Sequence, residues 1–407
     1  MSGIGLRGVL RVPGVSRLLA AQTFTVFGDT ALVLSLAVWT ENRTGNSSAA
    51  SMTIFAFLVG VVLAPSAGRF VSRHQPRWMM ALSNLTAGGI VLLLLMAEHV
   101  PFWLVYPFAA LYAFAGSIFA GVLVGYLREQ VAEPLRVPVN AEFQSLQQVL
   151  RLVAPVAGVW LLETGGNGLV VFVVTGTLVV GAVLVLLCPD VDVPPEPALP
   201  GPRWGSYGLI WADRNLRRVS VLAVLGNGAQ GFAQTLGFLV IQHSLHRSAG
   251  FIAVFVTIQS LAGIISTRIG AFRRITQPVR LVRIGLLLAG VGYAVLLLPG
   301  LYPVLGAFVI VGAGLPWVRI GYTSALQNYS TPATASRIAL AGQSLLSLAQ
   351  TAFIAVGALL GLFVDWWVLA VTMVVVFLTA AAIRGPATPP APALPPTDPR
   401  PTEEVSR

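Results

Sequence analysis

Long apolar runs alternate with short polar breaks along most of the chain. Each run has about twenty residues, which as a helix crosses a hydrocarbon layer about 30 Å thick. Breaks at charged residues, Pro and Gly divide the chain into twelve predicted transmembrane helices. We place them at residues 18–40, 48–67, 78–97, 102–125, 139–162, 168–187, 219–241, 249–269, 281–298, 302–323, 338–362 and 366–383.

The positions of the arginines test this division. If the N-terminus is cytoplasmic, every second connection should be rich in arginine, because positive residues gather in cytoplasmic loops. These connections hold Arg7, Arg11, Arg17, Arg69, Arg73, Arg77, Arg128, Arg136, Arg203, Arg214, Arg217, Arg218, Arg273, Arg274, Arg280 and Arg337. The opposite connections contain only Arg43 and Arg247. The alternation predicts an even number of helices, with both termini in the cytoplasm.

Two short segments occur twice in the chain. The basic segment "GRFVSRHQPRW" (68–78) returns as "GAFRRITQPVR" (270–280), and "QSLQQVLR" (144–151) returns as "QSLLSLAQ" (343–350). Both pairs are about 200 residues apart, so the chain is predicted to consist of two similar halves. We expect a cytoplasmic N-terminus at 1–17 and two six-helix bundles, at 18–188 and 219–384. A Pro-rich cytoplasmic linker (189–218) should join the bundles, and a disordered Pro-rich tail (385–407) should follow them.

Composition supports a membrane protein. Hydrophobic residues make up 56% of the chain and charged residues 10%, whereas a soluble domain has about 25% charged residues. All 25 basic residues are arginine, which favours a GC-rich bacterial source, and the net charge is +10. The gathering of arginines in the cytoplasmic connections explains this positive charge, so we expect no nucleic acid as a partner. With a single Cys188, a disulfide framework or multi-Cys metal site is excluded, and we expect no metal and no cofactor.

Two charged residues lie deep within predicted helices. Asp29 is in the first helix and Arg151 in the fifth, at a similar depth. A charge at the centre of a bilayer costs about 2.5–3.5 kcal/mol on insertion scales, so such residues are candidates for a functional site. We expect Asp29 and Arg151 to form an ion pair that binds and releases a proton. A buried ion pair with a purely structural role is the alternative.

Amides follow helical spacing on four predicted helices. In the fifth helix, Asn140, Gln144, Gln147, Gln148 and Arg151 share one face. Similar faces are formed by Gln22, Thr25 and Asp29, by Asn227, Gln230 and Gln234, and by Gln343, Ser347 and Gln350. Amides that face lipid would lack hydrogen-bond partners, so these faces should surround a polar substrate cavity. Hydrogen bonds that only hold helices together, at about 0.6 kcal/mol each, are the alternative.

Several motifs resemble those of the major facilitator superfamily over residues 7–384. The segment 68–78 is similar to the family's loop between helices two and three, with Gly68, Arg73 and Arg77 in place but Ser72 where the family has Asp. The segments "FGDTALVLSLAVW" (27–39), "VPVNAEF" (137–143), "APVAGVWLLETGG" (154–166) and "LQNYSTPATASRI" (326–338) resemble the macrolide-efflux and siderophore-export subgroup of drug:proton antiporters.

This resemblance implies an all-α fold of two pseudo-symmetric six-helix bundles in the cell membrane, acting as a monomer. It implies proton-coupled export of a small amphipathic molecule, such as a drug, antibiotic or secondary metabolite, by alternating access. Gly68, Arg73 and Arg77 would form a gating loop; a role in topology alone is equally open. Pro155 and Gly158 resemble the Gly-Pro element of antiporters and predict a bend in the fifth helix.

Other classes of protein are less favoured by the sequence. A phosphate-binding loop needs a Lys, and the chain has none, which excludes an ATP-driven pump of that type. Asp190 and Asp192 resemble a DxD metal site of membrane transferases, but no other acidic cluster faces them. His243 and His246 lack a third metal ligand. We expect no enzyme, and a receptor or scaffold that moves no solute remains the main alternative.

Overall fold

The computed structural model describes residues 12–45, 47–96, 101–191, 205–243, 245, 252–272 and 277–383. These residues are mostly helical, and no strand occurs among them. The first half contains α2 (Val15–Thr44), α3 (Ser47–Leu63), α5 (Pro76–Leu93), α6 (Val105–Gln130) and α7 (Glu133–Leu186). The second half contains α9 (Arg214–His243), α10 (Ile252–Phe272), α11 (Pro278–Leu296), α12 (Leu301–Tyr329), α13 (Ala335–Leu360) and α14 (Trp366–Ala382).

Helix α7 covers two of the predicted helices, 139–162 and 168–187. They are separated at Gly166, whose φ of 65° and ψ of −168° are not helical. Such a positive φ favours glycine, because any side chain there would be strained. When α7 is counted as two, the described part of the chain contains twelve long helices. The prediction of an all-α, twelve-helix membrane fold is therefore confirmed.

Short helices connect some of these elements. The first basic segment contains α4 (Gly68–Val71), which follows the 3-10 helix η1 (Ala64–Ala67), and two further 3-10 turns are η2 (Leu94–Met96) and η3 (Phe102–Leu104). Pro76 and Pro278, from the repeated Gln-Pro pair, each begin a helix, a position that suits a residue without an N–H. The linker contains the unpredicted helix α8 (Gly205–Ala212). Residues 192–204, 273–276 and 384–407 lie outside the described residues.

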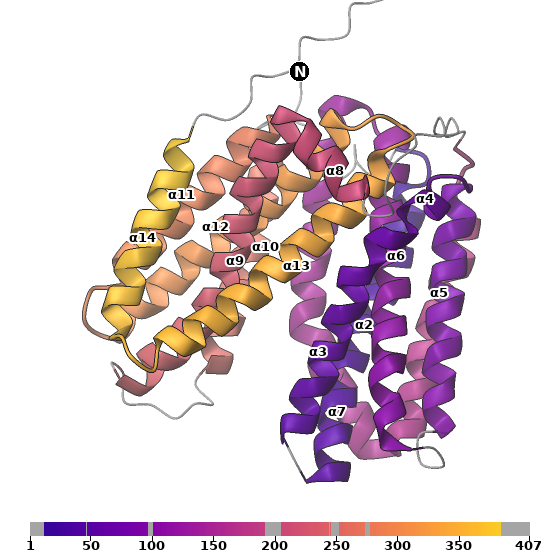
Figure 1. Cartoon of the computed structure of the whole chain (residues 1–407), viewed down its shortest axis with the longest axis horizontal. Coiled ribbons are helices and arrows are strands. Elements are labelled where there is room, and N and C mark those ends of the chain that lie inside the picture. Colours follow the sequence, from indigo (N-terminus) through magenta and orange to yellow (C-terminus); the bar gives the residue numbers. More distant parts are fainter. Residues whose placement is uncertain are drawn as a thin grey trace, which may run out of the picture.

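The helices form two bundles, α2–α7 and α9–α14 (Figure 1). Apolar side chains fill each bundle, with Tyr126 and Phe119 fully buried in the first and Phe255 and Phe377 in the second. We call the end at which α2 begins and α8 lies the linker side, and the other end the far side. The bundles contact each other near the linker side and separate toward the far side (Figure 1).

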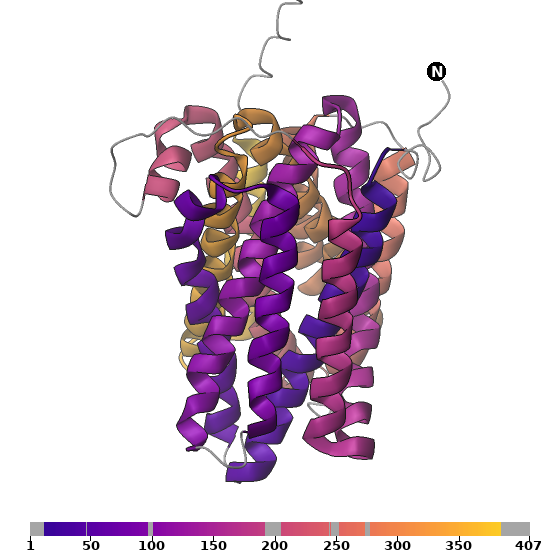
Figure 2. The same ribbon diagram turned by 90° about the vertical axis from the view of Figure 1, so that its right-hand side faces the viewer.

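The outer faces of both bundles are apolar. Val156 and Phe172 of the first bundle and Val375 of the second are 71%, 64% and 56% exposed, respectively. A soluble protein rarely exposes so many large apolar side chains, whereas lipid accommodates them. By length and composition, seven helical segments of the described residues could cross a membrane. In the first bundle the long helices run side by side, as a bilayer-spanning arrangement requires (Figure 2).

Candidate functional site

A cavity of about 440 Å³ lies between the two bundles. Its walls come from the part of α7 before Gly166, the middle of α9, and the parts of α10 and α12 nearer the far side. The lining residues are Gln148, Arg151, Gln230, Ala233, Phe255, Val256, Gln259, Ser260, Phe308, Gly312, Leu315 and Pro316. The cavity thus combines one cation and several amides with an apolar wall, in which the rings of Phe255 and Phe308 stack 4.2 Å apart.

A second cavity of about 190 Å³ lies nearer the linker side. Its lining includes Gln22, Asn140, Gln144, Gln147, Arg319, Tyr322 and Gln343. A space of about 10 Å³ shares Gln230 and Leu315 with the larger cavity and Arg319 and Tyr322 with the smaller one. The two cavities therefore adjoin, and polar side chains from both bundles surround them.

Most of the predicted polar faces line these cavities. All five predicted residues of the fifth helix do: Asn140, Gln144 and Gln147 line the smaller cavity, and Gln148 and Arg151 the larger one. Gln22, Gln230 and Gln343, from three other helices, line one or the other.

Three predicted cavity residues make contacts inside one bundle. Thr25 of α2 accepts a hydrogen bond from Asn84 Nδ2 at 2.9 Å. Asn227 Nδ2 of α9 donates to Leu346 O at 2.7 Å and to Gln350 Oε1 at 3.4 Å, both on α13. These amides hold helices together, which is the alternative considered from the sequence. Asn227 also borders the space of about 10 Å³ between the cavities, and the side chain of Gln234 lies outside the described residues.

Asp29 and Arg151 do not form the expected ion pair. The ion pairs found among the described residues involve neither of them. Instead, the Tyr112 hydroxyl of α6 donates a hydrogen bond to Asp29 Oδ1. The expectation was wrong for this conformation, because Asp29 turns toward α6 within its own bundle. Arg151 turns away from that bundle and is exposed in the cavity between the two.

Three further arginines within the predicted helices, Arg268, Arg283 and Arg319, were not singled out from the sequence. Arg319 of α12 donates two hydrogen bonds to Asn227 Oδ1, at 3.3 and 3.1 Å, and its charge is close enough to that of Arg151 for the two to repel. Arg268 of α10 forms an ion pair of 2.9 Å with Glu142 of α7. The charged positions themselves were the available signal, since each interrupts an apolar run.

The expected gating loop lies on the linker side. Arg77 forms an ion pair of 2.6 Å with Asp190, just after the end of α7, and Arg73 is exposed. Gly68 lies against the second half of the chain, since a Cβ there would be 2.8 Å from Ser206 Oγ and 3.2 Å from Arg337 Cγ. The carboxylate of Asp190 is thus paired with an arginine. Asp192, the second Asp of the DxD motif, lies outside the described residues.

Pro155 and Gly158 lie within α7, where it packs on α2. A Cβ at Gly158 would be 2.6 Å from the Ala31 carbonyl oxygen, so this position requires glycine for the close approach of the two helices. Pro155 has no N–H to donate to the carbonyl of Arg151. The helix continues through both residues, and the bend stays a prediction.

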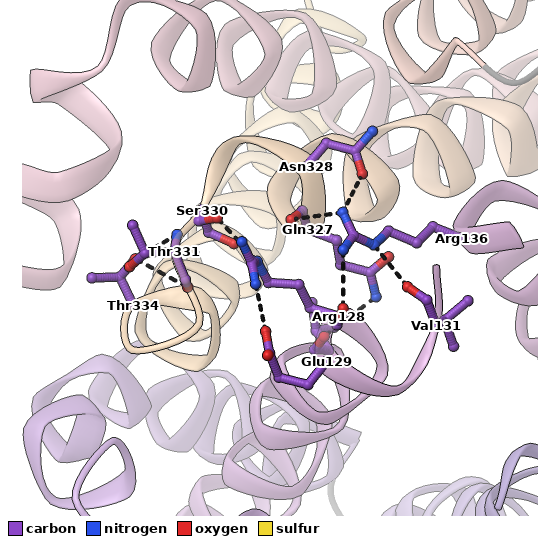
Figure 3. Close-up of polar contacts among 10 residues, drawn as sticks. Arg128, Glu129, Val131, Arg136, Gln327, Asn328, Ser330, Thr331 and Thr334 are labelled. Atoms are coloured by element: carbon purple, nitrogen blue, oxygen red, sulfur yellow. Dashed lines mark hydrogen bonds and ion pairs between the residues drawn. The ribbon is translucent and has the colours of Figure 1, made fainter. Parts of the chain in front are cut away.

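A cluster of polar residues joins the bundles on the linker side (Figure 3). Arg128 Nε of α6 donates to Ser330 O at 3.0 Å, and Arg136 Nη1 of α7 donates to Asn328 Oδ1 at 2.8 Å. Burial lowers the pKa of Arg136, Arg128 adds to this effect, and the carboxylates of Glu133 and Glu129 oppose it. We call Arg128, Arg136, Gln327, Asn328 and Ser330 the inter-bundle cluster.

The contact between the bundles continues from this cluster toward the far side. Asn140 Nδ2 donates to Ser324 Oγ and to Gln327 Oε1, both at 2.8 Å. Small residues allow α6 and α13 to approach closely, since a Cβ at Gly121 would be 2.5 Å from Leu340 Cγ. The Glu142–Arg268 ion pair adds a contact between α7 of the first bundle and α10 of the second. The two bundles are therefore joined on the linker side of both cavities.

Two helical bundles around a central polar cavity define a class of multi-pass membrane proteins that bind small molecules within the membrane. The sequence profile of the Major Facilitator Superfamily matches residues 18–352. The chain therefore belongs to this superfamily and has the fold of a secondary transporter. No curated protein is similar enough in sequence to match it.

Solved structures share this fold at low sequence identity. The human organic anion transporter MFSD10 (TETRAN) is 13% identical, with a TM-score of 0.74 over 90% of this chain and 98% of that one. A bacterial homologue of the iron transporter ferroportin, outward-facing, is 16% identical, with a TM-score of 0.72 over 91% and 98%. The transporter FucP, in the outward conformation, is 13% identical, with a TM-score of 0.73 over 92% and 99%.

Proposed function

We propose that the protein is a proton-coupled exporter of a small amphipathic molecule that works by alternating access. The observation that carries this proposal is the pair of adjoining cavities between the bundles, lined by amides and arginines beside an apolar wall. Such a combination suits a ligand with a polar and an apolar part. One chain supplies both walls, so a monomer is sufficient.

The arrangement of the bundles supports one orientation of this cycle. With both termini in the cytoplasm of the cell, as the arginine distribution predicts, the linker side is cytoplasmic. The inter-bundle cluster then closes the path to the cytoplasm, and the cavities belong to an outward-facing state. Separation of these contacts, with approach of the bundles on the far side, would give the inward-facing state.

Asp29 is the proposed proton-binding group. It is a carboxylate within a membrane helix, and its side chain accepts a hydrogen bond from the Tyr112 hydroxyl rather than pairing with a cation. A carboxylate in such surroundings can exist in both protonation states at moderate cost, which proton coupling requires. Arg151 contributes to the cavity instead, where it is available to the substrate.

Export and proton coupling are supported by resemblance and by fold. The sequence motifs resemble those of drug:proton antiporters that export macrolides or siderophores. One protein of the same fold, FucP from E. coli, is a fucose:proton symporter, so this architecture accommodates coupling to protons. We assign export to this chain because its motifs resemble those of the exporting subgroup.

Cells provide the test of direction and substrate. Strains that lack or overproduce the protein are compared for growth and intracellular accumulation across a panel of toxic amphipathic compounds. We expect overproduction to lower accumulation of one class of compound, and Asp29→Asn to remove this effect while the protein still inserts. Glu41→Gln, an exposed carboxylate on the same helix, should behave as the wild type. Ligand binding without any change in accumulation would instead indicate a receptor.

A further inference from the structure

The charged residues that line the two cavities are all positive. Arg151 lines the larger cavity and Arg319 the smaller one, and no Asp or Glu lines either among the described residues. The two guanidinium groups belong to different bundles and are close enough to repel each other. Taken together, the two adjoining cavities therefore have two positive charges and, among the described residues that line them, no negative charge.

The protein does not neutralise these charges in this conformation. No ion pair between either arginine and a carboxylate occurs in the described part of the chain. Arg319 is held by the neutral amide oxygen of Asn227, which fixes its position without cancelling its charge. Asp29, the carboxylate that the sequence suggested as the partner of Arg151, accepts a hydrogen bond from Tyr112 and lines neither cavity. An unpaired charge at this depth is costly, so a counter-charge from a ligand would be strongly favoured.

The rest of the site selects the shape of such a ligand. Guanidinium groups bind carboxylates and similar anions through paired hydrogen bonds. Besides Arg151 and the amides of Gln148, Gln230 and Gln259, the larger cavity has an apolar part, formed by the stacked rings of Phe255 and Phe308 and the side chain of Leu315. A volume of about 440 Å³ falls in the range of small-molecule sites.

We propose that the two adjoining cavities bind an amphipathic organic anion, with its charged head between Arg151 and Arg319 and its apolar part against Phe255 and Phe308. This inference rests on the proposed function, since it names the class of the exported molecule. Because the anion contacts one arginine from each bundle, its binding favours approach of the two bundles around it. Neutral and cationic molecules of the same shape lack this interaction.

Binding to matched compounds tests the proposal. The full-length protein in detergent is titrated with phenylacetate, phenylbutyrate and naphthaleneacetate, each beside its neutral amide and the corresponding amine. Thermal unfolding and calorimetry report the binding. We expect at least one carboxylate to bind about tenfold or more tightly than its amide, and the amine to bind most weakly, as charge-assisted hydrogen bonds predict.

Variants of the two arginines complete the experiment. Arg151→Gln and Arg319→Gln should each remove the preference for the carboxylate, whereas Arg151→Lys, which keeps the charge, should retain part of it. Arg280→Gln removes an exposed arginine at the start of α11 and should leave the preference unchanged. The Lys variant separates loss of charge from failure to fold.

Two results would overturn the proposal. One is that no carboxylate binds more tightly than its amide. The other is that the preference survives in both glutamine variants. Binding is measured in detergent without a gradient, so neither result decides whether export is proton-coupled; the transport experiment with Asp29→Asn decides that. Conversely, if Asp29→Asn has no effect on transport, the proposal of anion binding still stands.

Discussion

Arginines on the linker side and arginines in the cavities have opposite surroundings. On the linker side, Arg128 and Arg136 donate to backbone and side-chain oxygens of the other bundle, and Arg268 pairs with Glu142. In the cavities, Arg151 and Arg319 have no carboxylate partner among the described residues. The first group stabilises one conformation through contacts within the protein. The second group leaves its charge available to a ligand that can bind both bundles.

The comparison separates two ways of controlling the cycle. In the proposed cycle, contacts on the linker side set the balance between outward- and inward-facing states when the cavity is empty. The cavity arginines change this balance only when a ligand interacts differently with the two states. Substitutions on the linker side should therefore alter the distance between the bundles without ligand, and substitutions in the cavity should alter ligand binding.

The largest effect is expected for Gly121→Val. Its side chain would overlap Leu340, where even a Cβ would be 2.5 Å from Cγ. Overpacking costs about 1–3 kcal/mol, so the linker-side contact should open in most molecules. Spin labels at Thr164 and Leu362, on the far side, in a Cys188→Ser background should then move closer together, and transport should fall about tenfold or more.

Gly116→Val is the matched control on the same helix, because no atom lies within 4 Å of a Cβ at that position. It should keep the wild-type label distance. Equal effects of the two variants would mean that close approach of α6 and α13 does not determine the conformation.

A smaller effect is expected for Glu142→Gln. The variant loses the charge that pairs with Arg268, whose side chain is 45% exposed, so solvent partly compensates. We expect the label distances to shift toward the inward-facing state by about three- to tenfold in population. Glu41→Gln should not change them. A label distance unaffected by Glu142→Gln would remove this ion pair from the gate.

The smallest effect is expected for Arg77→Gln. Arg77 and Asp190 both belong to the first half of the chain, and the side chain of Asp190 is 51% exposed. Such a pair contributes at most about 1 kcal/mol to stability. The label distance should stay as in the wild type, with only a small decrease in thermal stability. A large change in the distance would restore the expected gating role of this arginine.

The sequence predicted the helices and the faces that line the cavities. Apolar runs placed the first helix at 18–40, and the structure has Val15–Thr44. The spacing from Asn140 to Arg151 placed five side chains on one face, and all five line the two cavities. These features follow from local periodicity, which the chain shows directly.

Contacts between distant helices could not be predicted in the same way. Tyr112 lies in an apolar run that also contains other tyrosines, so nothing in its local sequence marks it as the partner of Asp29. The expected pair, Asp29 and Arg151, assumed that similar depth implies contact, but direction around each helix also decides which side chains meet. Arg319 was detectable, since it interrupts the predicted helix 302–323, but its proximity to Arg151 depends on packing between bundles.

Transport in reconstituted vesicles tests the central claim most directly. Using a compound identified from the cellular panel, accumulation driven by a pH gradient is compared with exchange of labelled for unlabelled compound without a gradient. We predict that Asp29→Asn abolishes the gradient-driven accumulation but retains the exchange, while Glu41→Gln keeps both. Gradient-driven accumulation at the wild-type rate in Asp29→Asn would contradict the account.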